Sequence, residues 1–536
     1  MERADPAALT SRNAADGPPA SGEAPARRLE RLGAGAAALI LFLIPLWRFL
    51  RVAAARFDYP FDLEWVEGGV LLHAQRLLTG HSLYAAPSLD FIPFMYTPGY
   101  YALVAAVLRL GGSGYAAARL CSIAATLGTG ALVAWTARRA GNPAPLALAW
   151  AGLWFASFSL SGFFFDLARV DAVLTFVLMG AMAVLLEDVR RPRRATFALL
   201  VLLAVLAVLV KQNTVVFCAA LAAGLAAASG WRRGAAFAAW TAGALALVVL
   251  ALQAGSDGWF WFYTVSVPRS HGVEWSSLVD AARAAGLGGL PIAWLALPGL
   301  AALARAGGPP PVWRALALLL AAAFAADLGM TGHQWSFDNV HMPLHATLVL
   351  AVAVTAPALL AAIGSRRGAV PAWLVVGLAL QVWATGFDAA GQIPPRPARE
   401  ASQRVVRRLA ALAASAESRG GRILAPEFPY LLAQAGLRPC FHAAALSDLL
   451  YASRHGLAVD LSGLLPTARS GLAGYLRGEL RLPPLLAPAF DRSRAAPLGD
   501  DAEGWPPLVG MHDRPQRLVP GRGVQLAVGT PRVTDP

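Results

Sequence analysis

The stretch RRLERLGAGAAALILFLIPLW, residues 27–47, begins with basic residues and continues as an apolar run. Such a run is typical of a membrane-spanning helix, which needs roughly 20 mainly apolar residues. Basic residues mark the cytoplasmic side of a span, so we expect the N-terminus inside and residue 54 onward outside. The run begins far from Met1, which favours a retained signal anchor over a short cleavable signal peptide. Residues 1–28, rich in Ala, Pro, Ser and Gly, are predicted to form a disordered cytoplasmic tail.

The composition extends this interpretation to most of the chain. Of its 536 residues, 57% are hydrophobic and only 14% are charged, whereas soluble domains carry roughly 25% charged residues. The net charge of +13 comes from arginine, since Lys211 is the single lysine. Arginines that cluster between apolar runs anchor membrane topology, so we exclude nucleic-acid binding. The three cysteines are far apart and give no disulfide or zinc pattern.

Ten further apolar runs predict a polytopic α-helical membrane protein with about 11 transmembrane helices. They cover residues 115–136, 145–165, 171–187, 195–211, 213–229, 235–253, 287–305, 313–330, 343–363 and 369–386. The basic connectors ARRAGNP, EDVRRPRR, GWRRG, RAGGPPPVWR and GSRRG all fall on one side if these spans alternate. Residues 96–112 are apolar but short, and they are interpreted as a re-entrant or interfacial helix.

This topology divides the chain into a tail, a transmembrane domain at 29–387 with an outer loop at 54–95, and an extracytoplasmic C-terminal domain at 388–536. The pattern GGRILAPEFPYLLAQAG (420–436) predicts a strand, a turn and a helix, as in a small α/β domain. We expect the whole protein to lie in the cytoplasmic membrane of a bacterium.

The outer loop carries FDLEWVEGG (61–69), with three carboxylates at Asp62, Glu64 and Glu67. Apolar residues recur at helical spacing over 62–79 and predict an amphipathic helix on which Glu64 and Glu67 share a face. One interpretation is structural: Asp62 caps the helix and the acids suit its dipole. The other is functional: one of the acids is a general base or a metal ligand at the membrane surface.

Two more polar groups are predicted on the same face. FFFDLARVDAVL (163–174) places Asp166, Arg169 and Asp171 between two spans, either as a structural Asp166–Arg169 pair at helical spacing or as functional charges. Lys211 interrupts two apolar runs, and it either extends its ammonium group to the interface or neutralises a phosphate.

A third group lies in GHQWSFDNVHMPLH (332–345), which holds His333, Asp338, Asn339, His341 and His345. His341 and His345 have the spacing of metal ligands, but Pro343 lies between them, so ordinary loop polarity is the favoured interpretation. A divalent metal remains possible. The aromatic stretch 255–275 carries Arg269, and its rings suit either a membrane interface or a sugar or lipid groove.

These motifs, in this order, resemble the GT-C superfamily of integral-membrane glycosyltransferases, particularly protein O-mannosyltransferases and the lipid A aminoarabinose transferase. The likeness covers residues 33–386. It is carried by DLEWVEGGVLLHAQRLLTGHSLY (62–84), FMYTPGYYALVAAVL (94–108), LARVDAVLTF (167–176) and the polar loop before a late span. The family's adjacent acid pair is absent, since Val66 precedes Glu67, and the identity of the base therefore stays open.

The resemblance implies a sugar donor linked to polyprenyl phosphate at the outer face, and a glycan, lipid or protein acceptor. A carboxylate (Glu67, Glu64 or Asp62) would take the proton of the acceptor hydroxyl in a single inverting displacement. The leaving phosphate would be stabilised by Arg169, Lys211 or Arg269. Further substrate-binding candidates are Tyr96, Asp166, Asp171, Asp338, Asn339 and His341.

Two alternatives belong to other functional classes. A transporter or lipid flippase would also carry charges in its spans, but near mid-membrane and in two matching halves. A non-catalytic membrane scaffold would bind a partner through its outer domain, and it would tolerate replacement of the acids.

Overall fold

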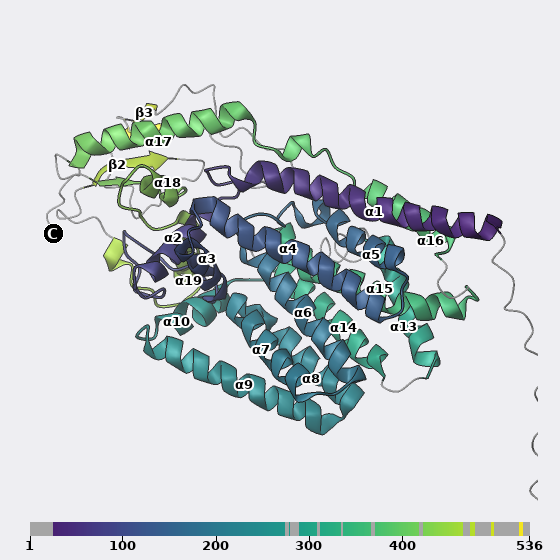
Figure 1. Ribbon diagram of the computed structural model, residues 1–536. Helices are drawn as coiled ribbons and strands as arrows, with labels where there is room; N and C mark the ends of the chain where they lie inside the picture. The colour runs from purple at the N-terminus through teal and green to yellow at the C-terminus, as the bar shows by residue number, and fades with distance from the viewer. Residues whose placement is uncertain are drawn as a thin grey trace, which may run out of the picture.

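The computed structural model describes residues 25–273, 278, 289–307, 311–333, 336–365, 370–417, 422–464, 472–477, 495–497 and 525–528. Helices dominate this part of the chain, and most of them run side by side in one bundle (Figure 1). Eight of the described helical segments are long and apolar enough to cross a membrane. The protein is therefore a polytopic α-helical membrane protein, as the composition predicts.

Eleven helices of the bundle overlap the eleven predicted spans. They are α1 (Pro25–Phe57), α4 (Gly114–Arg139), α5 (Ala144–Ala156), α6 (Val170–Arg190), α7 (Arg194–Val210), α8 (Val215–Ser229), α9 (Trp231–Ala254), α13 (Ala296–Arg305), α14 (Val312–Thr331), α15 (Met342–Ala362) and α16 (Ala372–Ala384). Eight of them belong to the long segments, and three lie in shorter apolar segments of 10–17 residues, Arg194–Val210, Pro291–Arg305 and Ala372–Ala384. Since α1 begins at Pro25, the last four residues of the predicted tail are helical; residues 1–24 lie outside the described part.

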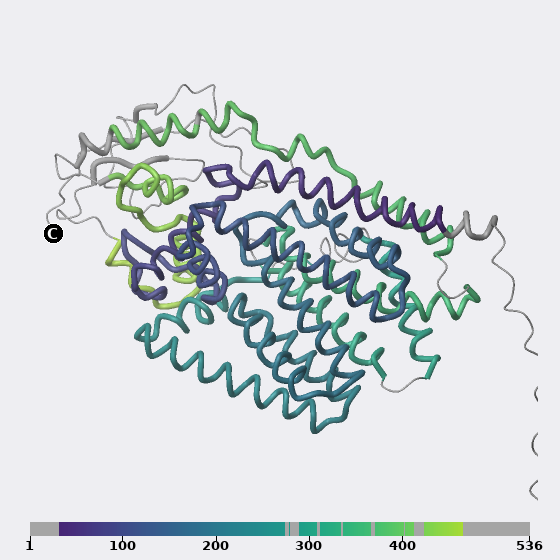
Figure 2. The backbone as a smooth tube through the Cα atoms, viewed as in Figure 1, coloured from purple at the N-terminus to yellow at the C-terminus, as the bar shows by residue number. Residues whose placement is uncertain are grey.

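Helices α6 and α15 form the centre of the bundle, where α6 packs against α4 and α7, and α15 against α13 and α14. The apolar windows of these two segments are 78% buried, whereas that of α9 is 11% buried. Figure 2 shows α9 running along the outside of the bundle. A helix that is apolar all round and yet unburied by protein matches a surface in contact with lipid.

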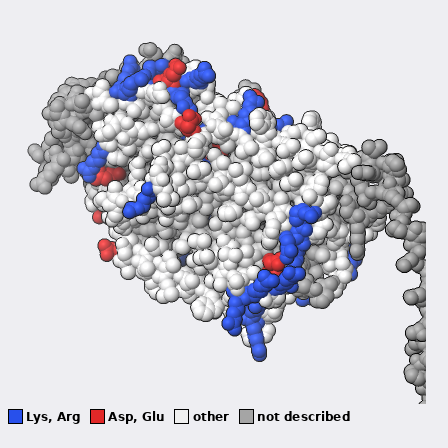
Figure 3. All heavy atoms as spheres, in the orientation of Figure 1, with Lys and Arg blue, Asp and Glu red and all other residues white. Residues whose placement is uncertain are grey.

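The two ends of the bundle differ in charge. Arginines gather where α4 meets α5, α6 meets α7 and α8 meets α9 (Figure 3). Two ion pairs brace this basic end, Arg139–Glu187 at 2.8 Å and Arg233–Asp188 at 2.7 Å. Residues 58–113 lie at the opposite end, which we call the loop end.

Two short helices cover the loop end. The first, α2 (Glu67–Leu78), begins five residues later than the predicted helix, because residues 58–66 form turns. The second, α3 (Gly99–Arg109), has 11 residues and so measures about 16 Å, roughly half of a bilayer's hydrocarbon thickness. It packs against α2, α4 and the end of α7. A Cβ on Gly99 would lie 2.6 Å from the carbonyl oxygen of Leu209, so only glycine permits this approach.

The loop end continues with α10 (Trp259–Trp261), a π-helical turn (Phe262–Ser266) and α11 (Val267–Ser270). The C-terminal region adds α17 (Arg396–Glu417), α18 (Pro429–Gln434) and α19 (Ala443–Arg454) to a four-stranded sheet. Its strands are β1 (Arg422–Leu424), β2 (Leu472–Arg477), β3 (Ala495–Pro497) and β4 (Gln525–Val528), in the order β1-β2-β4-β3. β1 pairs with β2 in parallel, and the other pairs are antiparallel. This is the predicted small α/β domain.

Candidate functional site

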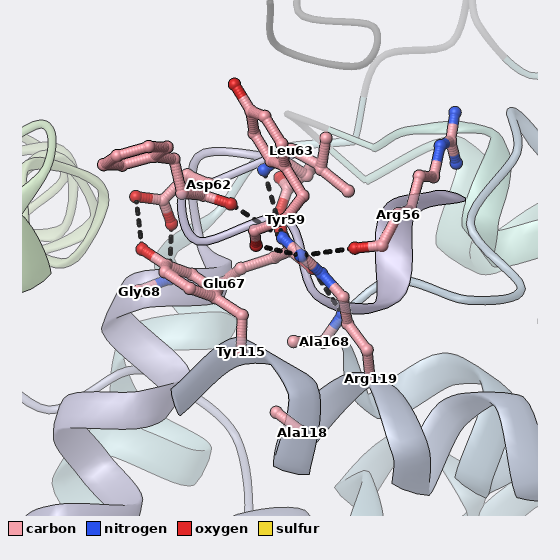
Figure 4. A network of polar contacts seen from close by, with 12 residues as sticks. Arg56, Tyr59, Asp62, Leu63, Glu67, Gly68, Tyr115, Ala118, Arg119 and Ala168 are labelled. Atoms are coloured by element: carbon pink, nitrogen blue, oxygen red, sulfur yellow. Dashed lines mark hydrogen bonds and ion pairs between the residues drawn. The ribbon is translucent and has the colours of Figure 1, made fainter. Parts of the chain in front are cut away.

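The Glu67 carboxylate is held by a full set of donors at the loop end (Figure 4). Arg119, from α4, donates to both of its oxygens, at 3.0 Å from Nε and 2.7 Å from Nη2. The backbone N–H groups of Leu63 and Ala168 each donate at 2.7 Å. Burial alone would raise the pKa of Glu67, but the Arg119 guanidinium and these hydrogen bonds hold it below its usual value. Glu67 is therefore an ionised and saturated anchor.

Arg119 also binds the backbone between α1 and α2. Its remaining N–H groups donate to the carbonyl oxygens of Arg56, Tyr59 and Phe61, at 2.6 to 2.8 Å. All of its donor capacity is thus used within the protein. One guanidinium fixes the backbone before Asp62 and the first residue of α2 together.

Asp62 binds the first turn of α2 from five residues before the helix begins. Its Oδ1 accepts from the N–H of Gly68 at 2.5 Å, and its Oδ2 accepts from the hydroxyl of Tyr115 at 2.9 Å (Figure 4). Burial and the nearby charge of Glu67 raise the pKa of Asp62 well above its usual value. Asp62 thus accepts from an N–H of the first turn of α2, as the capping interpretation expects, but it is not the N-cap residue: Val66 is, and Asp62 lies outside the observed helix although it is inside the predicted one.

Glu64 has hydrogen-bond partners that neither of the other two acids shares. Its Oε1 accepts from Arg169 at 2.9 Å, and its Oε2 accepts from the N–H of Val66 at 3.1 Å. Since Glu64 precedes α2, the expectation that it shares a helical face with Glu67 is wrong. Burial raises the pKa of Glu64, and the attraction of Arg169 only partly offsets this. Glu64 is thus the predicted acid that combines a raised pKa with a direct contact to a candidate phosphate-binding arginine.

A chain of charges continues from Glu64 across the loop end. Arg169 Nε lies 3.8 Å from Asp171 Oδ2, and the Lys211 ammonium lies 2.9 Å from Asp171 Oδ1. Asn339 donates to Asp171 Oδ2 at 2.7 Å. The structure therefore brings together five sequence candidates from four segments, all of them buried. We call Glu64, Arg169, Asp171, Lys211 and Asn339 the charge chain.

Asp166 stands apart from the charge chain. It pairs with Arg56 at 3.1 Å, and the Arg56 guanidinium also donates to the carbonyl oxygen and the side chain of Gln392. The helical Asp166–Arg169 pair is not formed, because residues 163–169 form turns before α6 begins. Both partners of the Arg56–Asp166 pair are buried, and the pair connects α1 to this turn.

Of the other predicted residues, one lies beside the charge chain and two are exposed. The ring of Tyr96 lies 5.7 Å from the Lys211 ammonium, at the edge of the charge chain. Arg269, at the end of α11, is exposed and takes part in none of the ion pairs of the described residues. Asp338 is also exposed, and its Cβ packs close to Gly162.

His341 and His345 contact different residues. His341 donates to Asp327 Oδ1 at 2.8 Å, and His345 contacts the hydroxyl of Ser161 at 3.2 Å. Their rings are 5.9 Å apart. Among the described residues no three His, Cys, Asp or Glu side chains stand together in a group that could hold a metal ion.

The C-terminal region packs against the turns before α2. His442, the N-cap of α19, donates from Nε2 to the carbonyl oxygen of Trp65 at 2.7 Å, while its Nδ1 accepts from Ala444. Gln434 donates to the carbonyl oxygen of Pro60 at 2.6 Å. Burial lowers the pKa of His442 to about 4, so the ring is neutral and keeps this tautomer. These hydrogen bonds fix the backbone before and after Glu64, at Pro60 and Trp65.

Four residues of this region were missed by sequence reasoning: Arg56, Tyr115, Arg119 and Asp327. Arg119 and Asp327 lie within predicted spans, and an ionisable residue inside a span is by itself a signal of pairing or function. Arg56 and Tyr115 border spans, and nothing in their sequence neighbourhood indicates their partners.

Comparison with known proteins places this arrangement in a wider context. No protein-family model and no curated protein sequence matches the chain. Among solved structures, it is similar to ArnT from Cupriavidus metallidurans bound to undecaprenyl phosphate, with a TM-score of 0.55 and 12% identity over 94% of this chain and 98% of that one. The apo state of the same protein gives 0.50 and 13% over the same shares. The chain thus shares the fold of this ArnT structure over nearly its whole length.

Proposed function

We propose that the protein is a membrane glycosyltransferase that moves a sugar from a polyprenyl-phosphate donor to an acceptor hydroxyl at the outer face of a bacterial cytoplasmic membrane. The observation that carries the proposal is the charge chain, in which a carboxylate of raised pKa contacts the first of two cations. Its place at the loop end of a GT-C fold supports the same conclusion.

Glu64 is the proposed general base. It accepts the proton of the acceptor hydroxyl as that oxygen attacks the anomeric carbon. The bond from this carbon to the phosphate oxygen breaks, the electron pair leaves with the polyprenyl phosphate, and the anomeric centre inverts. A carboxylate whose pKa is raised by burial is better suited to this step than the saturated, strongly ionised Glu67.

Arg169 and Lys211 are the proposed phosphate contacts. Arg169 Nε is buried without a hydrogen-bond partner and lies beyond bonding distance of Asp171, so it has a donor to offer. Positive groups at the leaving oxygen stabilise the charge that develops there. The similar ArnT structure is bound to undecaprenyl phosphate, which supports a lipid of this class as the donor's carrier.

The charge chain also argues against transport. Its members occupy the ends of α6, α7 and α15 and the turn before α2, rather than the middle of the bundle. A transporter places its substrate site near the midplane, between matching halves. The acceptor of the proposed transfer is a glycan, a lipid or a protein.

A transfer assay tests the proposal. Membranes containing the protein receive radiolabelled polyprenyl-phosphate sugars, and the wild type is compared with Glu64→Gln, Glu67→Gln and Asp62→Asn at equal abundance. We expect label transfer by the wild type and its loss in Glu64→Gln. If no donor of a broad panel is consumed, and the variants still support the phenotype lost on deletion, the enzyme proposal fails.

A further inference from the structure

The turn between α6 and α7 holds four arginines in five residues, RRPRR at 190–194, and no step above uses them. Arg191, Arg193 and Arg194 are exposed, and so is Arg232 at the start of α9. These four exposed side chains take part in none of the ion pairs of the described residues, unlike Arg139 and Arg233 nearby. Their positive charge is therefore not neutralised within the described part of the chain.

A buried carboxylate brings these arginines together. Asp188, near the end of α6, accepts from the guanidinium of Arg233 at 2.7 and 3.0 Å and from the hydroxyl of Thr196 at 2.5 Å. It also accepts from the backbone N–H of Arg193 at 3.4 Å. The end of α6 and the starts of α7 and α9 thus meet at one carboxylate, which places the RRPRR turn beside Arg232.

The acids of this area already have partners. Glu187 pairs with Arg139, and Asp188 pairs with Arg233. The α4–α5, α6–α7 and α8–α9 turns contain no other acidic residue. Figure 3 shows the resulting surface as a band of basic side chains with a small acidic spot within it. Such a surface attracts an anion, and guanidinium groups suit phosphate because they can donate two parallel hydrogen bonds to it.

Exposed apolar side chains adjoin the arginines. Along α7, three exposed leucines recur at the spacing of one helical face, and they are Leu199, Leu202 and Leu206. At the start of α9, Trp231 is 71% exposed, and the guanidinium of Arg232 lies over its ring at 5.6 Å. Exposed tryptophan beside basic residues is typical of the level where lipid headgroups meet acyl chains. A soluble anion would use only the charges, whereas a phospholipid would use both surfaces.

We propose that this surface binds an anionic phospholipid. Its phosphate contacts the arginines of the RRPRR turn and Arg232, and its acyl chains lie along the leucines of α7. Membrane topology requires only that such turns be positive, but a bound lipid requires a fixed arrangement of donors, which Asp188 supplies. The bound lipid holds the ends of α6, α7 and α9 together. The proposal does not depend on the proposed transfer, since the charge chain lies at the opposite end of the bundle.

Native mass spectrometry of the purified full chain tests the proposal with three probes. They are phosphatidylglycerol, phosphatidylcholine with the same acyl chains, and glycerol phosphate. We expect the Kd for phosphatidylglycerol to be at least tenfold lower than that for phosphatidylcholine, whose headgroup has no net charge. Glycerol phosphate, which has no chains, should not displace the bound lipid. Phosphatidylglycerol should also raise the Tm of the protein, because it binds the folded state.

Two variants and a matched control assign the site. Arg191→Gln/Arg194→Gln should raise the Kd for phosphatidylglycerol about 30-fold, and Arg232→Gln about fivefold, from the usual contribution of an arginine near an anionic membrane surface. The control is Arg396→Gln/Arg407→Gln, which removes the same charge from exposed positions of α17 and should leave this Kd unchanged.

Three outcomes overturn the proposal. The first is equal affinity of the wild type for the two lipids. The second is an unchanged Kd for phosphatidylglycerol in both Arg191→Gln/Arg194→Gln and Arg232→Gln; if the double variant does not fold, Arg232→Gln alone decides. The third is displacement of phosphatidylglycerol by glycerol phosphate at similar concentration, which would assign the surface to a soluble phosphate compound.

Discussion

Glu64 and Arg169 form a buried ion pair at 2.9 Å that joins positions 105 residues apart. It connects the turn before α2 to the start of α6. The proposed base and the proposed phosphate contact are thus direct neighbours, and each constrains the position of the other.

Replacing Glu64 by Gln keeps the size of the side chain and removes the base. We expect the transfer rate to fall by about 10²- to 10⁴-fold, the range that general-base catalysis contributes. Single-turnover transfer of a radiolabelled sugar measures it. Glu187→Gln, at the basic end of the bundle, is the control and should transfer normally. Near-normal transfer by Glu64→Gln together with loss in Asp62→Asn would name Asp62 as the base.

The pH profile of transfer follows from the raised pKa of Glu64. The base acts when deprotonated, so activity is present above its pKa and is lost as the pH falls through it. Because burial raises this pKa, the acid limb of kcat/KM should lie above the usual glutamate value of about 4.3. Enzyme returned from each pH to neutrality must recover full activity. A profile that is flat down to pH 4 contradicts this assignment.

Glu67→Gln should act on stability before it acts on chemistry. The change leaves the Arg119 guanidinium buried without its counter-charge, and breaking a buried pair costs about 3–5 kcal/mol. Thermal unfolding in detergent should show a clearly lowered Tm. Replacing the exposed Arg139 of the Arg139–Glu187 pair is the comparison, with an expected cost of about 0–1 kcal/mol. An unchanged Tm in Glu67→Gln would contradict the stabilising role assigned to the Glu67–Arg119 pair.

The cations of the loop end should differ in their effect on the donor. Lys211→Met removes an ammonium that contacts Asp171, and we expect the KM for the donor to rise about tenfold or more, since charge-assisted bonds are the strong ones. Arg269→Met removes an exposed charge that does not belong to the charge chain, and it should change the KM for the donor less than twofold. Steady-state kinetics in nanodiscs measures both. A larger rise in KM for Arg269→Met than for Lys211→Met would indicate that Arg269, and not Lys211, contacts the phosphate.

Gly68 permits α2 to meet the C-terminal region. A Cβ at this position would lie 2.8 Å from Cβ of Tyr430 and 2.9 Å from Asp62 Oδ1. Gly68→Ala should therefore expose the C-terminal region to limited proteolysis and lower the Tm. Gly243→Ala, on the open face of α9, meets nothing within 4 Å and should be neutral or slightly stabilising. Equal protease resistance of the two variants would contradict the close contact.

The sequence predicted the helices well, because each span leaves a long apolar run and each basic turn an arginine cluster. An α-helix overlaps each of the eleven predicted spans, although α5 and α13 cover only part of those predicted at 145–165 and 287–305. The short helix predicted at 96–112 appears as α3. The start of α2 was misplaced, since Leu63 and Val66 follow the apolar spacing of a helix but lie in turns. The backbone of these turns is held by Arg119, a partner more than 50 residues away, which periodicity cannot show.

The members of the site were largely predictable, but their partners were not. Charges at span ends identified Arg169, Asp171 and Lys211 as candidates. Pairing depends on which helices are neighbours, and so Arg169 was expected beside Asp166 but lies against Glu64, while Asp166 lies against Arg56. The three acids can be assigned different roles only when the hydrogen-bond donors of each carboxylate are known.

The contact between the C-terminal region and the turns before α2 has a consequence for biosynthesis. Trp65 receives its hydrogen bond from His442, 377 residues later, and Arg56 donates to Gln392, 336 residues later. The residues that contact the backbone on both sides of Glu64 are therefore synthesised after every described helix of the bundle. A polypeptide interrupted between α16 and α19 would sit in the membrane with every helix of the bundle and an unfinished site.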